Sequence, residues 1–123
     1  MSQISFNDEY LVNLLIEFIP EFKEEIISEF SFSSYIIYGD FGIFLADKIL
    51  NSKSEIDLIQ KCFDFLNNLI ENGDEKTIQM LRVTTLEILV DRTETIEAAK
   101  IYFTLKSLEI FSEVIFFVTG KSF

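Results

Sequence analysis

The stretch that decides the fold is residues 54–73, which read SEIDLIQKCFDFLNNLIENG. Its apolar side chains recur every three or four residues, which is the period of an α-helix. They form two adjacent stripes, one of Ile56, Ile59, Phe63, Leu66 and Ile70 and one of Leu58, Cys62, Phe65 and Leu69. A helix with so wide an apolar face has to be covered by other elements, so we expect this helix to be central to the core.

Capping signals mark the ends of this helix. Ser54 followed by Asp57 resembles a capping box in which the shorter Asp replaces the usual Glu. Gly73 is placed to end the helix in a left-handed conformation, and Asp74 is placed to cap the next one. That next helix is expected over residues 75–90, with apolar lines through Ile78, Leu81 and Ile88 and through Val83, Leu86 and Val90.

Helical spacing continues toward the C-terminus. A helix is expected to start at Thr93 and Glu94, and a last helix is expected over about residues 107–118, ended by Gly120. The pattern leaves open whether residues 104–107 break or continue the chain's helix. The apolar side chains of the last helix, with the Phe-rich stripes, are expected in the core; they are Leu108, Phe111, Ile115, Phe116, Phe117 and Val118.

The N-terminal part has the same period. Asn7 or Ser5 can cap a first helix that runs to Phe18, and Pro20 either kinks this helix or opens a second one, where its missing N–H costs nothing. The helical segment 20–30 then places four apolar side chains on one side, namely Phe22, Ile26, Ile27 and Phe30.

Residues 31–38 read SFSSYIIY and have a different character. An isolated strand would have nothing to pair with, so we expect a buried extended connection. Gly39 is expected to break it, and Asp40 to cap a helix over residues 41–50.

These elements predict one all-α domain over residues 1–123. Six or seven helices with short connections indicate a compact bundle of mostly antiparallel helices. The spacing of helix pairs also resembles an α-solenoid, but no repeated signature is present, so the bundle is preferred.

Composition excludes several classes of function. The chain has 10 Lys and Arg against 21 Asp and Glu, a net charge of −11, with no His and one Cys. A metal site that uses His or paired thiolates is excluded, and we expect no cofactor. Direct binding to nucleic acid or to an anionic membrane needs the cations that this chain lacks.

Catalysis would have to come from carboxylates. Asp40 and Glu87 could form an acid–base pair, and Glu109 and Glu113 could bind a divalent metal, but helix capping and solvated helix faces explain these residues more simply. Cys62 lies within an apolar stripe and is expected to be buried and unreactive. We therefore expect that the protein is not an enzyme.

Acidic residues concentrate in residues 1–30, where Lys23 is the only cation. Several of them lie four residues apart, a spacing at which like charges destabilise a helix. The segment is either a solvated face or a surface that attracts a basic partner. The candidate partner-binding residues are Asp8, Glu9, Glu17, Glu21, Glu24, Glu25 and Glu29.

Together these features resemble the small, acidic, all-helical immunity proteins that bacteria encode beside contact-dependent or other polymorphic toxins. Two stretches are similar to an uncharacterised bacterial helical family that often accompanies such toxins. They are YIIYGDF at 35–41 with Phe44-Leu45, like an aromatic-Gly-Asp turn that opens a helix, and TTLEIL at 84–89. The resemblance implies a protein that binds and neutralises a cognate toxin domain, often a basic RNase-type nuclease.

An alternative function is a helical adaptor that holds a partner helix in an apolar groove. An adaptor predicts a contiguous exposed apolar patch and binding insensitive to salt, whereas a charge-driven inhibitor predicts binding that weakens with salt. No segment reaches the roughly 18 uninterrupted apolar residues that span a bilayer, and the N-terminal stretch lacks the basic region of a signal peptide. We therefore expect a cytoplasmic protein, and a monomer.

Overall fold

The computed structural model describes residues 3–25, 33–52 and 54–121, and within these ranges the chain is all-α. No strand occurs in them, only a single parallel bridge between Ile4 and Gly73. The predicted fold class is confirmed. The helices are α1 (Asp8–Phe18), α2 (Pro20–Glu25), α3 (Ser34–Asn51), α4 (Ile56–Asn72), α5 (Glu75–Val83), α6 (Thr85–Leu89), α7 (Thr93–Tyr102) and α8 (Leu105–Thr119).

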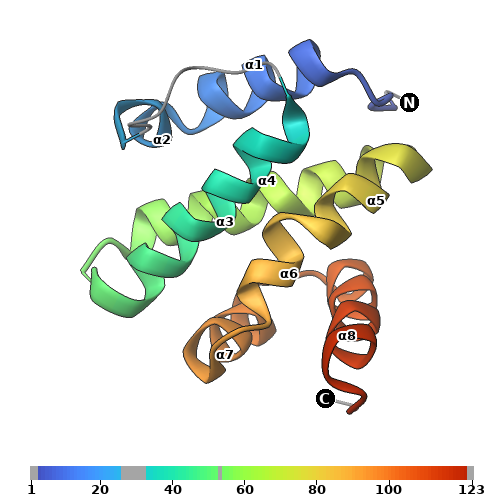
Figure 1. The fold of residues 1–123 in the computed structure, drawn as a ribbon. Coiled ribbons are helices and arrows are strands. Elements are labelled where there is room, and N and C mark those ends of the chain that lie inside the picture. The colour runs from blue at the N-terminus through green and yellow to red at the C-terminus, as the bar shows by residue number, and fades with distance from the viewer. Residues whose placement is uncertain (1–2, 26–32, 53, 122–123) are drawn as a thin grey trace.

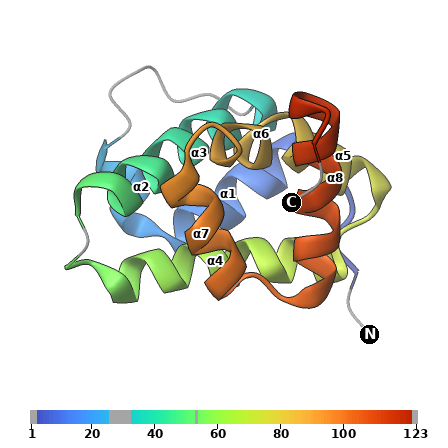
Figure 2. The same cartoon turned by 90° about the horizontal axis from the view of Figure 1, so that it is seen from below.

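The helices pack around α3, which contacts α1, α2, α4, α5, α6 and α7. In Figure 1, α1 and α2 lie on one side of α3 and α4, while α7 and α8 lie on the other. The view from below in Figure 2 shows α7 crossing between α3 and α4, both of which it contacts. A solenoid would bring together only neighbouring repeats. Because α3 also contacts α6 and α7, the arrangement is a bundle.

The third helix is longer than the sequence predicts. The prediction of an extended connection over residues 31–38, broken at Gly39 and followed by a helix capped by Asp40, is wrong, because α3 runs from Ser34 to Asn51. Gly39 and Asp40 lie inside this helix, so the aromatic-Gly-Asp segment is not a turn. Residues 31 and 32 lie outside the described ranges.

A distant carboxylate explains this early start. Asp8 Oδ1 accepts hydrogen bonds from the Ser34 backbone N–H at 2.8 Å and from the Ser34 hydroxyl at 2.6 Å. Asp8 therefore caps α3 from 26 positions earlier in the chain, where no local pattern could indicate it. One turn later, the buried Tyr38 hydroxyl donates to the Leu11 carbonyl oxygen at 2.7 Å, which joins α3 to α1 again.

Helices α3 and α6 cross closely at Gly42. A Cβ added to Gly42 would lie 3.0 Å from Ile88 Cδ1 and 3.1 Å from the Thr85 Cα, so the absent side chain permits the approach. The buried Thr85 hydroxyl donates to the Tyr38 carbonyl oxygen across the same crossing, at 2.7 Å. The two stretches that carry the family resemblance therefore pack against each other.

The prediction of a single helix over residues 75–90 is wrong, because the helix is interrupted at Thr84. Its φ of −120° and ψ of −97° are not helical. The Thr84 hydroxyl donates to the Met80 carbonyl oxygen at 2.7 Å, a bond to the preceding turn that often bends helices. The break lets α6 change direction from α5 and lie on α3.

In the described part of the chain the core contains two aromatic clusters, and α4 contributes to both. Ring centroids lie 5.4–6.5 Å apart in the first, made by Phe22, Tyr38, Phe41, Phe44 and Phe65. They lie 5.0–5.6 Å apart in the second, made by Phe63, Tyr102, Phe103 and Phe111. These are separations at which aromatic pairs attract each other. Because α4 supplies Phe63 and Phe65, its predicted place in the core is confirmed.

Several predicted helix ends are confirmed. Asn7 Oδ1 accepts from the Tyr10 N–H at 2.9 Å at the start of α1, and Pro20 opens α2. Asp74 Oδ1 accepts from the Thr77 N–H at 2.9 Å at the start of α5. Gly120 ends α8 in the left-handed region, with φ of 73°.

Other predicted ends are wrong. No capping box forms at Ser54, because Glu55 precedes α4 and makes no side-chain cap. Gly73 is extended, not left-handed, with φ of −79°; it is needed because a Cβ there would lie 2.3 Å from the Leu69 carbonyl oxygen. The question left open at 104–107 is resolved as a break, since Thr104 caps a separate α8.

The predicted helix over residues 26–30, with Ile26, Ile27 and Phe30, lies outside the described ranges. Within those ranges, none of the helices combines the length and the apolar character required to cross a bilayer.

The α3–α6 crossing predicts opposite effects for two glycines of one helix. Gly39→Ala should raise the free energy of unfolding by about 0.5–1 kcal/mol, because nothing lies within 4 Å of the added Cβ and Ala favours helix. Gly42→Ala should lower it, because separating α3 from α6 costs about 1–3 kcal/mol. Urea unfolding of both variants measures the difference, and equal stabilisation by the two would contradict the crossing.

The Asp8 cap predicts a pH dependence of stability. The hydrogen bonds from Ser34, first from its hydroxyl and then from its N–H, lower the pKa of Asp8 from its usual 3.8. The cap's contribution is therefore present above pH 3.8 and is lost as the pH falls through the lower, folded-state pKa. Asp8→Ala should lower the free energy of unfolding by about 1 kcal/mol at neutral pH and by less in acid, as measured by urea unfolding at each pH. Glu9→Ala, in the same first turn of α1, serves as the control and should cost little at either pH.

Candidate functional site

Three of the predicted partner-binding carboxylates make interactions inside the protein. Asp8 caps α3, as described above. Glu21 on α2 forms an ion pair with Lys61 on α4 at 2.9 Å, and Glu25 forms one with Lys48 on α3 at 2.8 Å. The hydrogen bond that Lys61 donates to Glu21 lowers the pKa of Glu21, and the hydrogen bond that Lys48 donates to Glu25 raises the pKa of Lys48. These two pairs connect α2 to α4 and to α3.

Three other predicted carboxylates remain available to a partner. Glu9, Glu17 and Glu24 are exposed and form no ion pair within the described part of the chain. Glu29 lies outside the described ranges. The acidic face of α1 and α2 therefore offers fewer uncompensated charges than the sequence indicates.

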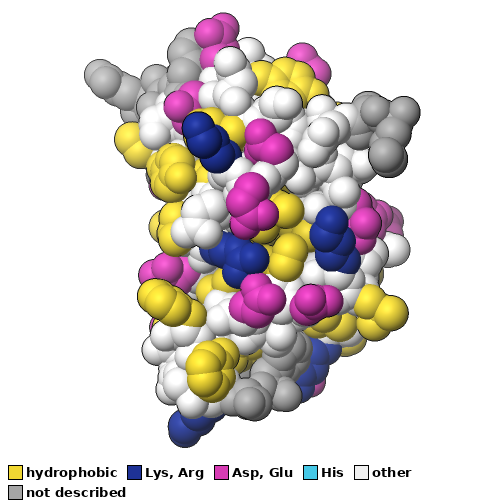
Figure 3. Space-filling view, turned by 90° about the vertical axis from the view of Figure 1, so that its right-hand side faces the viewer, with side chains coloured by type: hydrophobic (Ala, Val, Ile, Leu, Met, Phe, Trp, Pro, Cys, Tyr) yellow, Lys and Arg dark blue, Asp and Glu magenta, His cyan; other side chains and the backbone are white. Residues whose placement is uncertain are grey.

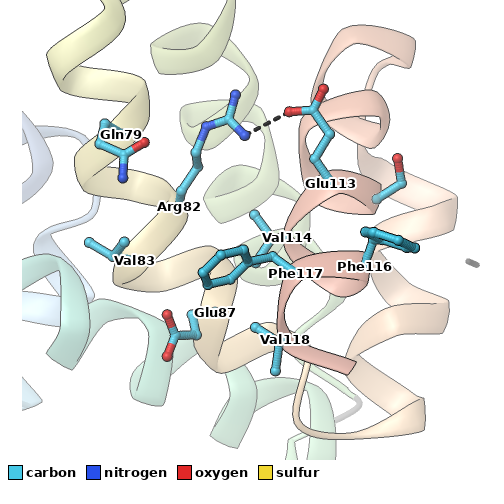
Figure 4. Close-up of a pocket in the computed structure, with 10 residues that line it drawn as sticks. Gln79, Arg82, Val83, Glu87, Glu113, Val114, Phe116, Phe117 and Val118 are labelled. Atoms are coloured by element: carbon cyan, nitrogen blue, oxygen red, sulfur yellow. Dashed lines mark hydrogen bonds and ion pairs between the residues drawn. The ribbon is translucent and has the colours of Figure 1, made fainter. Parts of the chain in front are cut away.

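A second candidate surface is an open pocket of about 880 Å³ between α5, α6 and α8 (Figure 4). We call it the α8 pocket. Its apolar lining consists of Val83, Val114, Phe116, Phe117 and Val118. Its polar lining consists of Gln79, Arg82, Glu87, Ser112 and Glu113.

The aromatic side chains of this pocket correct a sequence prediction. Phe111 is buried as expected, but Phe116 and Phe117 are 60% and 88% exposed, so their placement in the core is wrong. Val118 is also about half exposed. Three consecutive residues spread over more than half of a helix circumference, so they cannot all face one core. That run of three apolar residues was the available signal for the pocket.

Charged groups occupy two ends of the α8 pocket. Arg82 Nη1 and Glu113 Oε1 form an ion pair at 2.6 Å, while Glu87 lies at the other end, with Phe117 between them (Figure 4). Arg82 Nε is buried and has no hydrogen-bond partner among the described residues. Glu87 is exposed and has no ion-pair partner in those residues either.

The surface around this pocket mixes chemical types. Figure 3 views the side of the molecule on which the ends of α5 and α8 lie, and acidic, basic and hydrophobic side chains are interspersed on it. Hydrophobic side chains gather along one edge of that view. This face therefore suits a partner with both apolar and charged groups.

Metal-binding groups and the one thiol were the remaining candidates for a chemical role. The described residues contain no group of three or more His, Cys, Asp or Glu side chains that could hold a metal ion. Cys62 is buried as predicted, and burial raises the pKa of its thiol to about 12. The thiol is therefore protonated at neutral pH, when only a thiolate would be a nucleophile.

Comparison with known proteins relates this geometry to a family. The model of a family described as a domain of unknown function (DUF7674) matches residues 12–118. No curated protein and no solved structure matches the chain. The match begins in α1 and ends in α8, so it includes α3, its crossing with α6 and the whole α8 pocket. The chain therefore belongs to the DUF7674 family.

Proposed function

We propose that this protein is an immunity-type inhibitor, which binds a cationic toxin domain and blocks it. The observation that carries the proposal is the net charge of −11 on a helical domain that also has an open apolar pocket. Opposite charge accelerates capture of a basic partner, and a buried apolar contact slows its release. Basic nucleases fit this description, because a surface that binds a polyanion also attracts carboxylates.

The exposed carboxylates of α1 and α2 and the α8 pocket have different roles in this proposal. Glu9, Glu17 and Glu24 are exposed carboxylates that steer a cationic partner from a distance. The α8 pocket supplies the apolar contact that exposed carboxylates cannot provide, because exposed ion pairs contribute little to stability. Binding by such a pair of surfaces needs no cofactor and no chemical step.

The α8 pocket also favours a second candidate function, the helical adaptor, since exposed Phe116 and Phe117 could hold a partner helix. The two functions differ in their response to salt. Affinity of an adaptor should be almost unchanged between about 50 and 500 mM NaCl, whereas capture by the inhibitor should slow steeply, because added salt shortens the range of charge attraction.

The direct test is protection of a growing cell. A bacterium that expresses the basic C-terminal domain of a secreted protein encoded immediately upstream should stop growing, and co-expression of this protein should restore growth. The purified pair should bind with an association rate that falls with salt. Growth arrest that is unchanged by co-expression, or the absence of such a neighbour, would contradict the inhibitor.

Charge reversal tests the acidic face. Glu17→Lys with Glu24→Lys changes the net charge from −11 to −7, since each reversal adds two charges. Association with the toxin domain should slow about three- to tenfold at low salt, measured by stopped flow or interferometry. Glu21 and Glu25 are unsuitable because reversal there would place Lys beside Lys61 and Lys48.

A matched control separates local from overall charge. Glu71→Lys with Asp91→Lys produces the same net charge at two exposed positions, one on α4 and one between α6 and α7, neither of which forms an ion pair within the described residues. The control should slow association less. Equal slowing by both double variants would remove the α1–α2 face from the interface.

A further inference from the structure

We propose that the α8 pocket receives an arginine side chain of the protein partner, with its guanidinium group at Glu87 and the Phe117 ring, and its aliphatic part against Val83. This inference rests on the proposed function, because it specifies which group of a cationic partner the protein binds in this pocket.

A cation is the complementary occupant because the pocket has one uncompensated carboxylate. Arg82, the only basic residue that lines the pocket in the described part of the chain, forms an ion pair with Glu113 at the far end, at 2.6 Å. Figure 4 places Phe117 between that pair and Glu87. Glu87 therefore presents a negative charge to whatever enters between α6 and α8.

The apolar walls restrict the kind of cation. A purely apolar occupant would remove water from Glu87 without giving it a partner, which is costly, and an acidic occupant would be repelled. A side chain with an aliphatic stem and a charged tip satisfies both the valines and the carboxylate. Arginine suits the site better than lysine, because its planar guanidinium stacks on an exposed ring such as Phe117 while it pairs with a carboxylate.

This chain is a poor source of that arginine. It has two arginines, Arg82 and Arg92. Arg82 is already part of the pocket wall. Arg92 is already in an ion pair, with its Nη2 atom 3.7 Å from Glu94 Oε2. A second copy would also bring another net charge of −11. These charges favour a partner of opposite net charge over self-association.

The test uses short peptides and the intact protein. Acetyl-Leu-Arg-Leu-amide and its citrulline analogue, which has nearly the same shape without the charge, are titrated into ¹⁵N-labelled protein. The arginine peptide should shift the backbone amide signals of residues 83, 87 and 114–118, and the citrulline peptide should bind about three- to fivefold more weakly.

Variants complete a double-mutant comparison. Glu87→Gln should lower the affinity for the arginine peptide about three- to fivefold and leave the affinity for the citrulline peptide unchanged. Glu71→Gln, at an exposed position of α4, should change neither. Because Glu87 is exposed, its replacement by Gln keeps the fold, which the spectrum of the free variant verifies.

Three results would overturn the assignment. They are equal binding of the arginine and citrulline peptides, equal effects of Glu87→Gln and Glu71→Gln, and signal shifts that fall on α1 and α2 instead. Self-association through the pocket would appear as concentration-dependent shifts without peptide and would overturn it as well. Peptide binding in a protein that gives no growth protection would refute the inhibitor and support the arginine site. Growth protection without peptide binding would refute the site alone.

Discussion

The close crossing of α3 over α6 is the constraint on which the rest of the structure depends. It requires a residue without a side chain at Gly42 and a buried hydroxyl at Thr85, whose bond to Tyr38 satisfies a carbonyl group. For α6 to reach this position the chain has to leave the direction of α5, and it does so at Thr84. The same change of direction places α6 beside α8, and the α8 pocket lies between α5, α6 and α8.

Local signals in the sequence were enough to identify most helices and some of their ends. The three- and four-residue spacing of apolar residues located α1, α4, α7 and α8, and short-range capping groups at Asn7 and Asp74 act where they were expected. What could not be predicted depends on contacts between distant parts of the chain. The start of α3 is set by Asp8, and the β-branched and aromatic residues before Gly39 become helical because Ile37 and Tyr38 are buried.

The candidate site was predictable in charge but not in position. The number of carboxylates indicates an acidic segment. It does not indicate that Glu21 pairs with a lysine of α4 and Glu25 with a lysine of α3. The same limit applies to Phe116 and Phe117, which composition assigns to the core. Helix geometry requires that some residue of the run 116–118 face away from the core, but which residues do so depends on how α8 is oriented against α5 and α6.

The position of Cys62 makes its thiol an internal probe of how often the core opens. The thiol lies on α4 next to Phe63 and three residues before Phe65, one from each aromatic cluster, and it is the chain's single cysteine. A thiol-specific reagent can reach it only after the packing around α4 has opened, since the side chain is fully buried. The labelling rate at this sulfur therefore reports the opening of the interior, and ligands that hold the folded form should slow it.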